Sequence, residues 1–271
     1  MQTDQSDLTR FLGEARAAAD EAARIQIASY GKTIDVERKG DINLVTEVDL
    51  HCERVIVERL HKAFPEHRIL AEEGSEKESA SGYRWIIDPL DGTTNYAHGY
   101  PRFCVAIALE HSGSILLAVV RDPVLDEEFV AVRGQGATLN GRPIRVSDQT
   151  DMLRSLLATG FAYDVRESAV NNLDHFGAFI LSAQAVRRDG SAELNLCYTA
   201  MGRFDGFWEM KLSPWDVAAG GLIVREAGGM VTDFEDRPNE LDGARIVASN
   251  GKIHAEMLEI ISRTERGEAG V

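Results

Sequence analysis

The feature that most constrains the fold is an apolar run that ends in two acidic residues. Trp85–Ile87 forms the run, and Asp88 and Asp91 follow it with Pro89 between them. Pro89 removes one backbone amide and fixes φ, so the chain can turn both aspartates toward a common point. The amides of 92–95 can then open a helix and receive an anion. The segment predicts a buried strand that ends at a charge-binding turn.

Local turn chemistry offers an alternative, an Asx-type turn with Thr93 or Thr94 as a helix N-cap. Two other acidic segments favour the charge-binding interpretation. Glu72-Glu73 ends another short strand, where only one carboxylate can point inward, and Asp216 begins an apolar helix. Taken singly, the first fits a solvated face and the second a helix dipole. Together the segments supply hard oxygen ligands without a nearby His or Cys, a set that suits Mg²⁺ rather than zinc.

Composition narrows the class of protein. The chain has 271 residues, of which 44% are hydrophobic, so it can bury a large core as one large domain or two subdomains. A formal net charge of −15 argues against a nucleic-acid or anionic-membrane partner. Three separated cysteines indicate neither a disulfide framework nor a zinc site, and no apolar stretch approaches the ~18 residues of a membrane span. We therefore expect a soluble, cytoplasmic protein.

The first half predicts two helices and then a sheet. The first helix runs from Leu8 to Ala23 behind Ser6 or Asp7 as N-cap, and the second runs from Cys52 until Pro65 stops it. A short extended piece, Leu44 to Thr46, lies between them. Five β-rich runs then predict a largely antiparallel sheet. They are Arg68–Ala71, Arg84–Asp88, Phe103–Leu109, Ser114–Arg121 and Glu127–Arg133.

The second half alternates strands with helices. Gly134–Pro143, with the turn signal Asn140-Gly141, is the candidate junction, which divides the chain into subdomains 1–143 and 144–271. The alternation beyond it indicates a layered α/β arrangement. The predicted strands are Leu156–Thr159, Gly206–Met210, Met230–Phe234 and Arg245–Ser249, and the predicted helices are Ser168–Gln184, Ala192–Met201, Trp215–Ala227 and Ile253–Arg263.

The ordered acidic segments resemble the inositol monophosphatase family of Mg²⁺-dependent, lithium-sensitive phosphomonoesterases. The resemblance covers nearly the whole chain. Its defining motifs are Glu72-Glu73, the segment from Asp88 to Asn95, and the segment from Trp215 to Gly220; its secondary ones are Leu44-Val45-Thr46 with Asp49, Gly190-Ser191-Ala192, and Glu226 to Gly229. The resemblance implies a mixed α+β, layered αβαβα sugar-phosphatase-like fold with two subdomains, and a homodimer.

The resemblance also implies a role for each motif residue. The implied Mg²⁺ ligands are Glu72, Asp88, the backbone carbonyl of Leu90, Asp91 and Asp216, most of them in the first subdomain. Glu72 and Thr93, the latter held by Asp49, would be the catalytic residues that act on the attacking water. The implied substrate contacts are the amides of Gly92 and Thr93 for the phosphate, together with Ala192, Glu209 and Asp216.

Some positions and the substrate stay open at this point. Lys39 matches a loop lysine near the metals, but Asn43 stands where an aspartate is frequent. Glu193 stands where a small residue is frequent, and we expect it to face either solvent or substrate. Inositol monophosphate is the first expected substrate. The alternatives are histidinol phosphate, fructose 1,6-bisphosphate, a 3′-phosphoadenosine nucleotide, or a regulatory binding role on the same fold.

Overall fold

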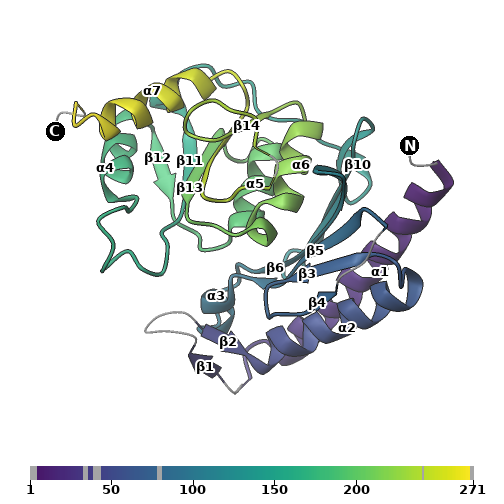
Figure 1. Ribbon diagram of the computed structural model, residues 1–271. Helices are drawn as coiled ribbons and strands as arrows, with labels where there is room; N and C mark the ends of the chain where they lie inside the picture. The colour runs from purple at the N-terminus through teal and green to yellow at the C-terminus, as the bar shows by residue number, and fades with distance from the viewer. Residues whose placement is uncertain (1–4, 33–35, 39–43, 78–80, 240, 269–271) are drawn as a thin grey trace.

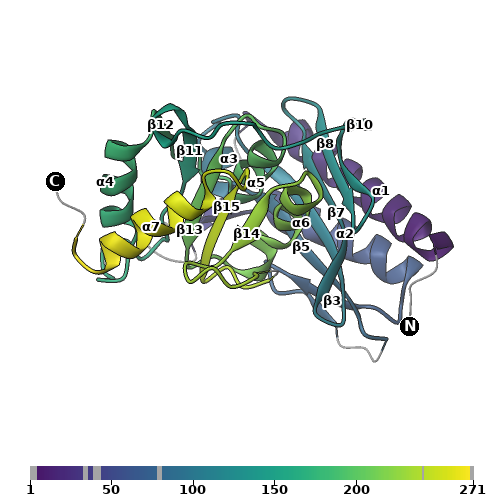
Figure 2. The ribbon, with the colours of Figure 1, turned by 90° about the horizontal axis from the view of Figure 1, so that it is seen from above.

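The computed structural model describes residues 5–32, 36–38, 44–77, 81–239 and 241–268. Helices and sheets alternate in five layers, which Figures 1 and 2 show from two directions. The expected αβαβα arrangement is confirmed. The outer pair of helices is α1 (Gln5–Ser29) and α2 (Glu47–Ala63), the middle pair is α5 (Ala192–Ala200) and α6 (Ala218–Glu226), and the opposite outer pair is α4 (Leu173–Ser182) and α7 (His254–Glu265).

An eight-stranded sheet lies between α1–α2 and the middle helices, in the order β10-β9-β8-β7-β6-β5-β3-β4. Neighbouring strands pair antiparallel except β3 and β5, which are parallel, so the largely antiparallel sheet is confirmed. The strands are β3 (Arg68–Ala71), β4 (Glu76–Lys77), β5 (Tyr83–Asp91), β6 (Cys104–His111), β7 (Ser114–Asp122), β8 (Glu127–Val132), β9 (Gly136–Leu139) and β10 (Arg142–Pro143).

Both faces of this sheet are buried, which explains its unbroken apolar runs. In β5, Trp85 and Ile87 pack in the core formed with α1 and α2, whereas Ile86 packs in the core shared with α5 and α6. Successive side chains of a strand point to opposite faces, so a sheet covered by helices on both sides needs apolar residues at every position. The layered fold therefore follows from the run that precedes Asp88.

A second, five-stranded sheet has the order β12-β11-β13-β15-β14. β11 pairs parallel with β12 and β13, whereas β15 pairs antiparallel with β13 and β14. Phe207 faces the middle helices and Trp208 the outer ones. The strands are β11 (Leu156–Thr159), β12 (Ala185–Arg187), β13 (Gly206–Met210), β14 (Met230–Thr232) and β15 (Arg245–Ser249).

Short elements complete the fold around the site. They are β1 (Val36–Arg38), β2 (Leu44–Thr46), α3 (Thr93–Ala97) and two 3-10 helices, η1 (Met152–Arg154) and η2 (Pro214–Asp216). The three cysteines are buried and free, as expected. In the part of the chain that the structure describes, no helix is both long and apolar enough to cross a membrane. Lys39 and Asn43 lie outside the described residues.

Two sequence predictions about local structure were wrong. α1 begins at Gln5, so Ser6 and Asp7 lie inside its first turn instead of capping it. α2 begins before Cys52, because Thr46 caps its amides. The turn predicted at Asn140-Gly141 is present: both residues have positive φ and join β9 to β10. The division of the chain at residue 143 stays a prediction.

Candidate active site

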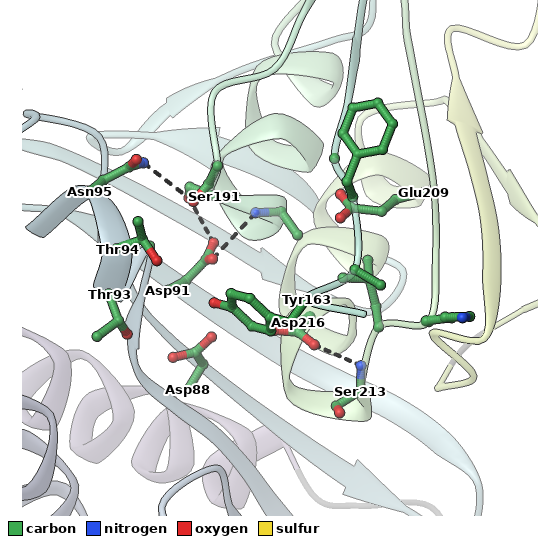
Figure 3. Close-up of a pocket in the computed structure, with 18 of the residues that line it drawn as sticks. Asp88, Asp91, Thr93, Thr94, Asn95, Tyr163, Ser191, Glu209, Ser213 and Asp216 are labelled. Atoms are coloured by element: carbon green, nitrogen blue, oxygen red, sulfur yellow. Dashed lines mark hydrogen bonds between the residues drawn. The ribbon is translucent and has the colours of Figure 1, made fainter. Parts of the chain in front are cut away.

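A cavity of about 530 Å³ opens between the two sheets. Figure 3 shows Asp88 and Asp91 on one side of it and Glu209 and Asp216 on the other. The structure thus brings together side chains that are far apart in the sequence. The predicted site residues that line the cavity are Glu72, Asp88, Leu90, Asp91, Gly92, Thr93, Ala192, Glu209 and Asp216.

Parallel pairing of β3 and β5 places Glu72 and Asp88 at the same edge of the sheet. Ala71 is the register partner of Ile87, and the Glu72 amide donates to the Ile87 carbonyl at 3.2 Å. Parallel strands end together, so the residue after each strand emerges at one edge. Glu72 lines the cavity but Glu73 does not, which agrees with the expectation that only one of them points inward.

β5 continues through the Asp88-Pro89 step to Asp91, so its predicted end at Asp88 was wrong, but its regular pairing with β6 is interrupted there. The register between β5 and β6 shifts between Asp88 and Asp91, and the Leu90 amide donates to Asp88 Oδ1 at 3.0 Å. Asp88 is fully buried. Burial raises the pKa of Asp88 well above its ordinary value, and the charges of Glu72, Asp91 and Asp216 raise it further.

Gly92 is required by the backbone at this turn. Its φ is +97°, and a Cβ would lie 2.7 Å from the Arg102 carbonyl oxygen. Gly92 is the N-cap of α3 and provides no side-chain cap, while Thr93 and Thr94 lie inside the helix. The Asx turn at Asp88 is present, because the Leu90 amide donates to Asp88 Oδ1. The alternative of a threonine N-cap for α3 is wrong, because Gly92 occupies that position.

Thr93 is instead held by Asp49, as the resemblance implied. Thr93 Oγ1 donates to Asp49 Oδ1 at 2.8 Å and lies 3.1 Å from the Leu90 carbonyl oxygen. The other oxygen of Asp49 accepts the backbone amide and the hydroxyl of Thr46, which closes the capping box of α2. Burial raises the pKa of Asp49, and the bonds from Thr46 and Thr93 partly offset this shift. Asp49 is therefore fixed from both sides behind Thr93.

Asp91 connects the end of β5 to the start of α5. Its Oδ2 accepts Ser191 Oγ at 2.6 Å and the Glu193 amide at 2.8 Å, while its Oδ1 accepts the Ala192 amide at 3.3 Å. These groups form the start of α5, where an anion is stabilised by unpaired amides. Burial raises the pKa of Asp91, and these hydrogen bonds oppose the rise, with the bond from Ser191 the strongest of them.

Asp216 and Glu209 form the far wall. Asp216 Oδ2 accepts the Ser213 amide at 2.6 Å within η2, and burial raises the pKa of Asp216 to about 7. Burial and the charges of Asp216 and Asp91 raise the pKa of Glu209 to about 8, against a lowering effect of Arg188. Gly160 leaves room for the Glu209 carboxylate, because a Cβ there would lie 2.1 Å from Glu209 Oε1.

The donor set fits a hard cation. Four carboxylates line one cavity, those of Glu72, Asp88, Asp91 and Asp216. After burial, the charges of the other three acids are what raises the pKa of Asp88 most. Carboxylate and carbonyl oxygens are the ligands that Mg²⁺ prefers. Within the ranges that the structure describes, no group of three or more His, Cys, Asp or Glu side chains is close enough together to hold a metal ion. The assignment of individual ligands therefore stays a prediction.

Two buried glutamates near the site have roles that the sequence did not predict: Glu53 was not singled out at all, and Glu193 was singled out with the wrong expectations. Glu53 on α2 accepts the amides of Glu73 at 2.7 Å and Ser75 at 3.1 Å, so it anchors the loop that carries Glu72. Glu193 is completely buried and does not line the cavity, so both expectations for it, solvent-facing and substrate-facing, were wrong. Its carboxylate binds the first turn of α6. Glu193 is the one acid on α5, which is a signal in the sequence, whereas Glu53 is one of four acids on α2 and nothing in the sequence distinguishes it.

Comparisons with known proteins agree with this geometry. A model of the inositol monophosphatase family matches residues 6–266. The Nus factor SuhB of Pseudomonas aeruginosa is 46% identical over 260 residues, which cover 93% of this chain and 95% of that protein. The inositol-1-monophosphatase of Synechocystis sp. is 43% identical over 261 residues, which cover 96% and 91%.

A solved structure of inositol monophosphatase from Anabaena (Nostoc) sp. has a TM-score of 0.86 to this chain at 43% identity. The match covers 95% of this chain and 97% of that one. The protein therefore belongs to the inositol monophosphatase family, a family of phosphatases.

Proposed function

We propose that this protein hydrolyses a small phosphate monoester, inositol monophosphate first, with Mg²⁺ as cofactor and water as nucleophile. The observation that carries the proposal is the convergence of four carboxylates from three separate segments on one cavity. Two unit negative charges 4 Å apart at an effective dielectric of 20 repel by about 4 kcal/mol, so cations that offset the carboxylate charge favour entry of a dianionic phosphate. Family membership supports the same chemistry.

The proposed ligands are Glu72, Asp88, the Leu90 carbonyl, Asp91 and Asp216. Bound Mg²⁺ supplies charge neutralisation for the phosphate, greater acidity of the attacking water and stabilisation of the leaving alkoxide. The protein's contribution is to hold these oxygens on different elements around one cavity. Asp91 accepts two backbone amides, Asp88 and Asp216 accept one each, and Glu72 directly follows β3, which is paired with β5.

Thr93 and Asp49 are the proposed catalytic pair, with Glu72 beside them. Because the Thr93 hydroxyl donates to Asp49 at 2.8 Å, its oxygen can take a proton from the attacking water on the cavity side while its own proton passes to the Asp49 carboxylate. The oriented water attacks phosphorus, the bond between phosphorus and the alcohol oxygen breaks, and the departing alkoxide takes up a proton from solvent. The amides of Gly92 and Thr93 are the proposed phosphate contacts. No covalent enzyme nucleophile is needed.

A phosphate-release panel in the presence of Mg²⁺ tests the substrate. Inositol 1-phosphate, histidinol phosphate, fructose 1,6-bisphosphate and adenosine 3′,5′-bisphosphate represent the candidate classes. We expect the highest kcat/KM for inositol 1-phosphate. A preference for another ester by tenfold or more would reassign the substrate while leaving the phosphatase mechanism in place.

A regulatory role is the second candidate function. Similarity to the Nus factor SuhB of Pseudomonas aeruginosa favours it, because that name does not describe a phosphatase. Metal-independent binding of a partner protein without turnover of any ester would support this role over hydrolysis. The homodimer, the cytoplasmic location and inhibition by Li⁺ stay predictions.

Glu209 is the proposed specificity residue, and Glu209→Gln tests it. At pH 9, above its pKa of about 8, the carboxylate is the stronger acceptor for substrate hydroxyls. We expect the variant to lose about 1–3 kcal/mol, roughly 5–150-fold, in kcat/KM for inositol 1-phosphate. An aryl phosphate without those hydroxyls should lose much less.

Glu167→Gln is the matched control, because Glu167 is exposed and does not line the cavity. Glu167→Gln should leave kcat/KM unchanged for both inositol 1-phosphate and the aryl phosphate. Equal losses on the two esters in Glu209→Gln, or a shifted Mg²⁺ requirement, would assign Glu209 to the scaffold or to the metal ligands.

A further inference from the structure

Glu193 links two helices that start at the candidate site. It is the second residue of α5 and is completely buried. Its Oε1 accepts the Ala219 amide at 3.2 Å, and its Oε2 accepts the Gly220 amide at 2.5 Å. Val217, the N-cap of α6, provides no side-chain hydrogen bond. The carboxylate that accepts the first amides of α6 therefore comes from the neighbouring helix α5.

The same residue also contacts the opposite wall of the site. The Glu193 backbone amide donates to Asp91 Oδ2 at 2.8 Å, beside the bond from Ser191. Asp216 lies two residues before α6, which the Glu193 side chain holds. Through one residue, the end of β5 is thus joined to the segment that carries Asp216.

The packing around Glu193 leaves little freedom for this link. A Cβ on Gly220 would lie 2.7 Å from Glu193 Oε2 and 2.5 Å from Leu196 Cβ, so the two helices approach as closely as the glycine allows. Hydrogen bonds to an ionised group are short and directional. Both oxygens of Glu193 are occupied by amides, and the side chain does not line the cavity, so it cannot itself be a ligand there.

We propose that Glu193 is a positioning residue that sets the separation of Asp91 and Asp216, and that cation affinity depends on it although it does not touch the cation. This inference rests on the proposed function for the identity of the cation. Groups that orient ligands typically change metal affinity by about 10–100-fold when they are mutated. The expected effect of disturbing Glu193 is therefore on Mg²⁺ binding before it is on the chemical step.

Two variants separate geometry from charge. Glu193→Asp keeps the negative charge but is one methylene too short to reach both amides of α6. Glu193→Gln keeps the length but replaces one acceptor with a donor. Each should raise the Mg²⁺ dissociation constant, measured by calorimetry without substrate, by about tenfold or more. The kcat at saturating Mg²⁺ should change by less than about threefold, because no group that contacts substrate is altered.

Asp122→Asn is the matched control. Asp122 is completely buried and its Oδ1 accepts the amides of Val124 at 2.8 Å and Leu125 at 3.0 Å, but it does not line the cavity. Its variant perturbs a similar buried acceptor and should leave Mg²⁺ affinity unchanged. Thermal unfolding of the metal-free variants reports whether each one folds, and Glu193→Asp, which keeps the charge, decides the question by itself if Glu193→Gln does not fold.

Three results would overturn the proposal. An unchanged Mg²⁺ dissociation constant in Glu193→Asp, with weaker binding in Glu193→Gln only, would indicate a long-range charge effect instead of positioning. Unchanged binding in both variants would make Glu193 purely structural. Equal weakening in the Asp122 control would indicate loss of overall stability. If the wild type binds Mg²⁺ but releases no phosphate from any ester, the proposed function fails while the positioning role of Glu193 stands.

Discussion

Asp88→Asn is expected to lower phosphate release by at least about 100-fold and to stabilise the metal-free protein. The first effect follows from the loss of a proposed Mg²⁺ ligand. Losing a ligand should reduce activity at least as much as losing a group that only orients a ligand. The second follows from burial: Asp88 is fully buried among Glu72, Asp91 and Asp216, which all raise its pKa. Asparagine keeps the volume and the oxygen that accepts the Leu90 amide.

The stability effect has a defined pH dependence. Because the pKa of Asp88 is raised in the folded state, the metal-free wild type loses stability as pH rises from the unfolded value near 4 through the folded one. Asparagine does not titrate, so its advantage should be largest above the folded pKa and should vanish near pH 4. A gain of about 1 kcal/mol would raise Tm by roughly 2–4 °C.

Thermal unfolding in EDTA at several pH values, together with phosphate release in Mg²⁺, measures both effects of Asp88→Asn. Asp122→Asn serves again as the buried control and should retain full activity. Wild-type turnover at an unchanged Mg²⁺ requirement would exclude Asp88 as a ligand. A lower Tm at neutral pH would show that the carboxylate is not under repulsive strain.

Thr93→Ala is expected to reduce kcat by about 10²–10⁴-fold with little change in KM. General acid–base groups contribute rate factors of that size, and the backbone amide proposed to contact phosphate is retained. The variant also leaves buried Asp49 Oδ1 without its partner, which should cost about 1–3 kcal/mol of stability. Steady-state kinetics and thermal unfolding measure the two effects separately.

Thr93→Ser is the control for this prediction, because it keeps the hydroxyl that donates to Asp49. It should retain activity within about tenfold of the wild type. Asp49→Asn should resemble Thr93→Ala in kcat, since it disturbs the acceptor behind the hydroxyl. If Thr93→Ala raised KM alone, Thr93 would be a substrate contact and the pair with Asp49 would have no catalytic part.

Patterns within one segment predicted much of the fold and site. The Trp85–Ile87 run indicated a buried strand, and the step at Pro89 indicated the turn that points Asp88 and Asp91 inward. β3, β11, β13 and β15 have the predicted bounds because their apolar runs end at clear turn signals. The Thr46-x-x-Asp49 spacing is also a local capping pattern, and it would have placed the start of α2 correctly.

Contacts between distant segments were not predictable in the same way. Glu193 caps α6 from α5, and Glu53 holds the Glu73 amide from α2, so neither partner is visible in the local sequence. The sequence left the Glu193 side chain facing either solvent or substrate, and nothing in it distinguished Glu53 from the other acids of α2. Both glutamates are buried because backbone amides without partners at a helix start and in a loop stabilise a carboxylate there. Only the packing of the layers shows this.

The most direct test of the account is phosphate release by the wild type from inositol 1-phosphate in excess EDTA and then after readdition of Mg²⁺. We expect no measurable activity in EDTA, because the carboxylates of Asp88, Asp91 and their neighbours repel the phosphate dianion. We expect full recovery of phosphate release when Mg²⁺ is added back. Full activity in EDTA would contradict the account.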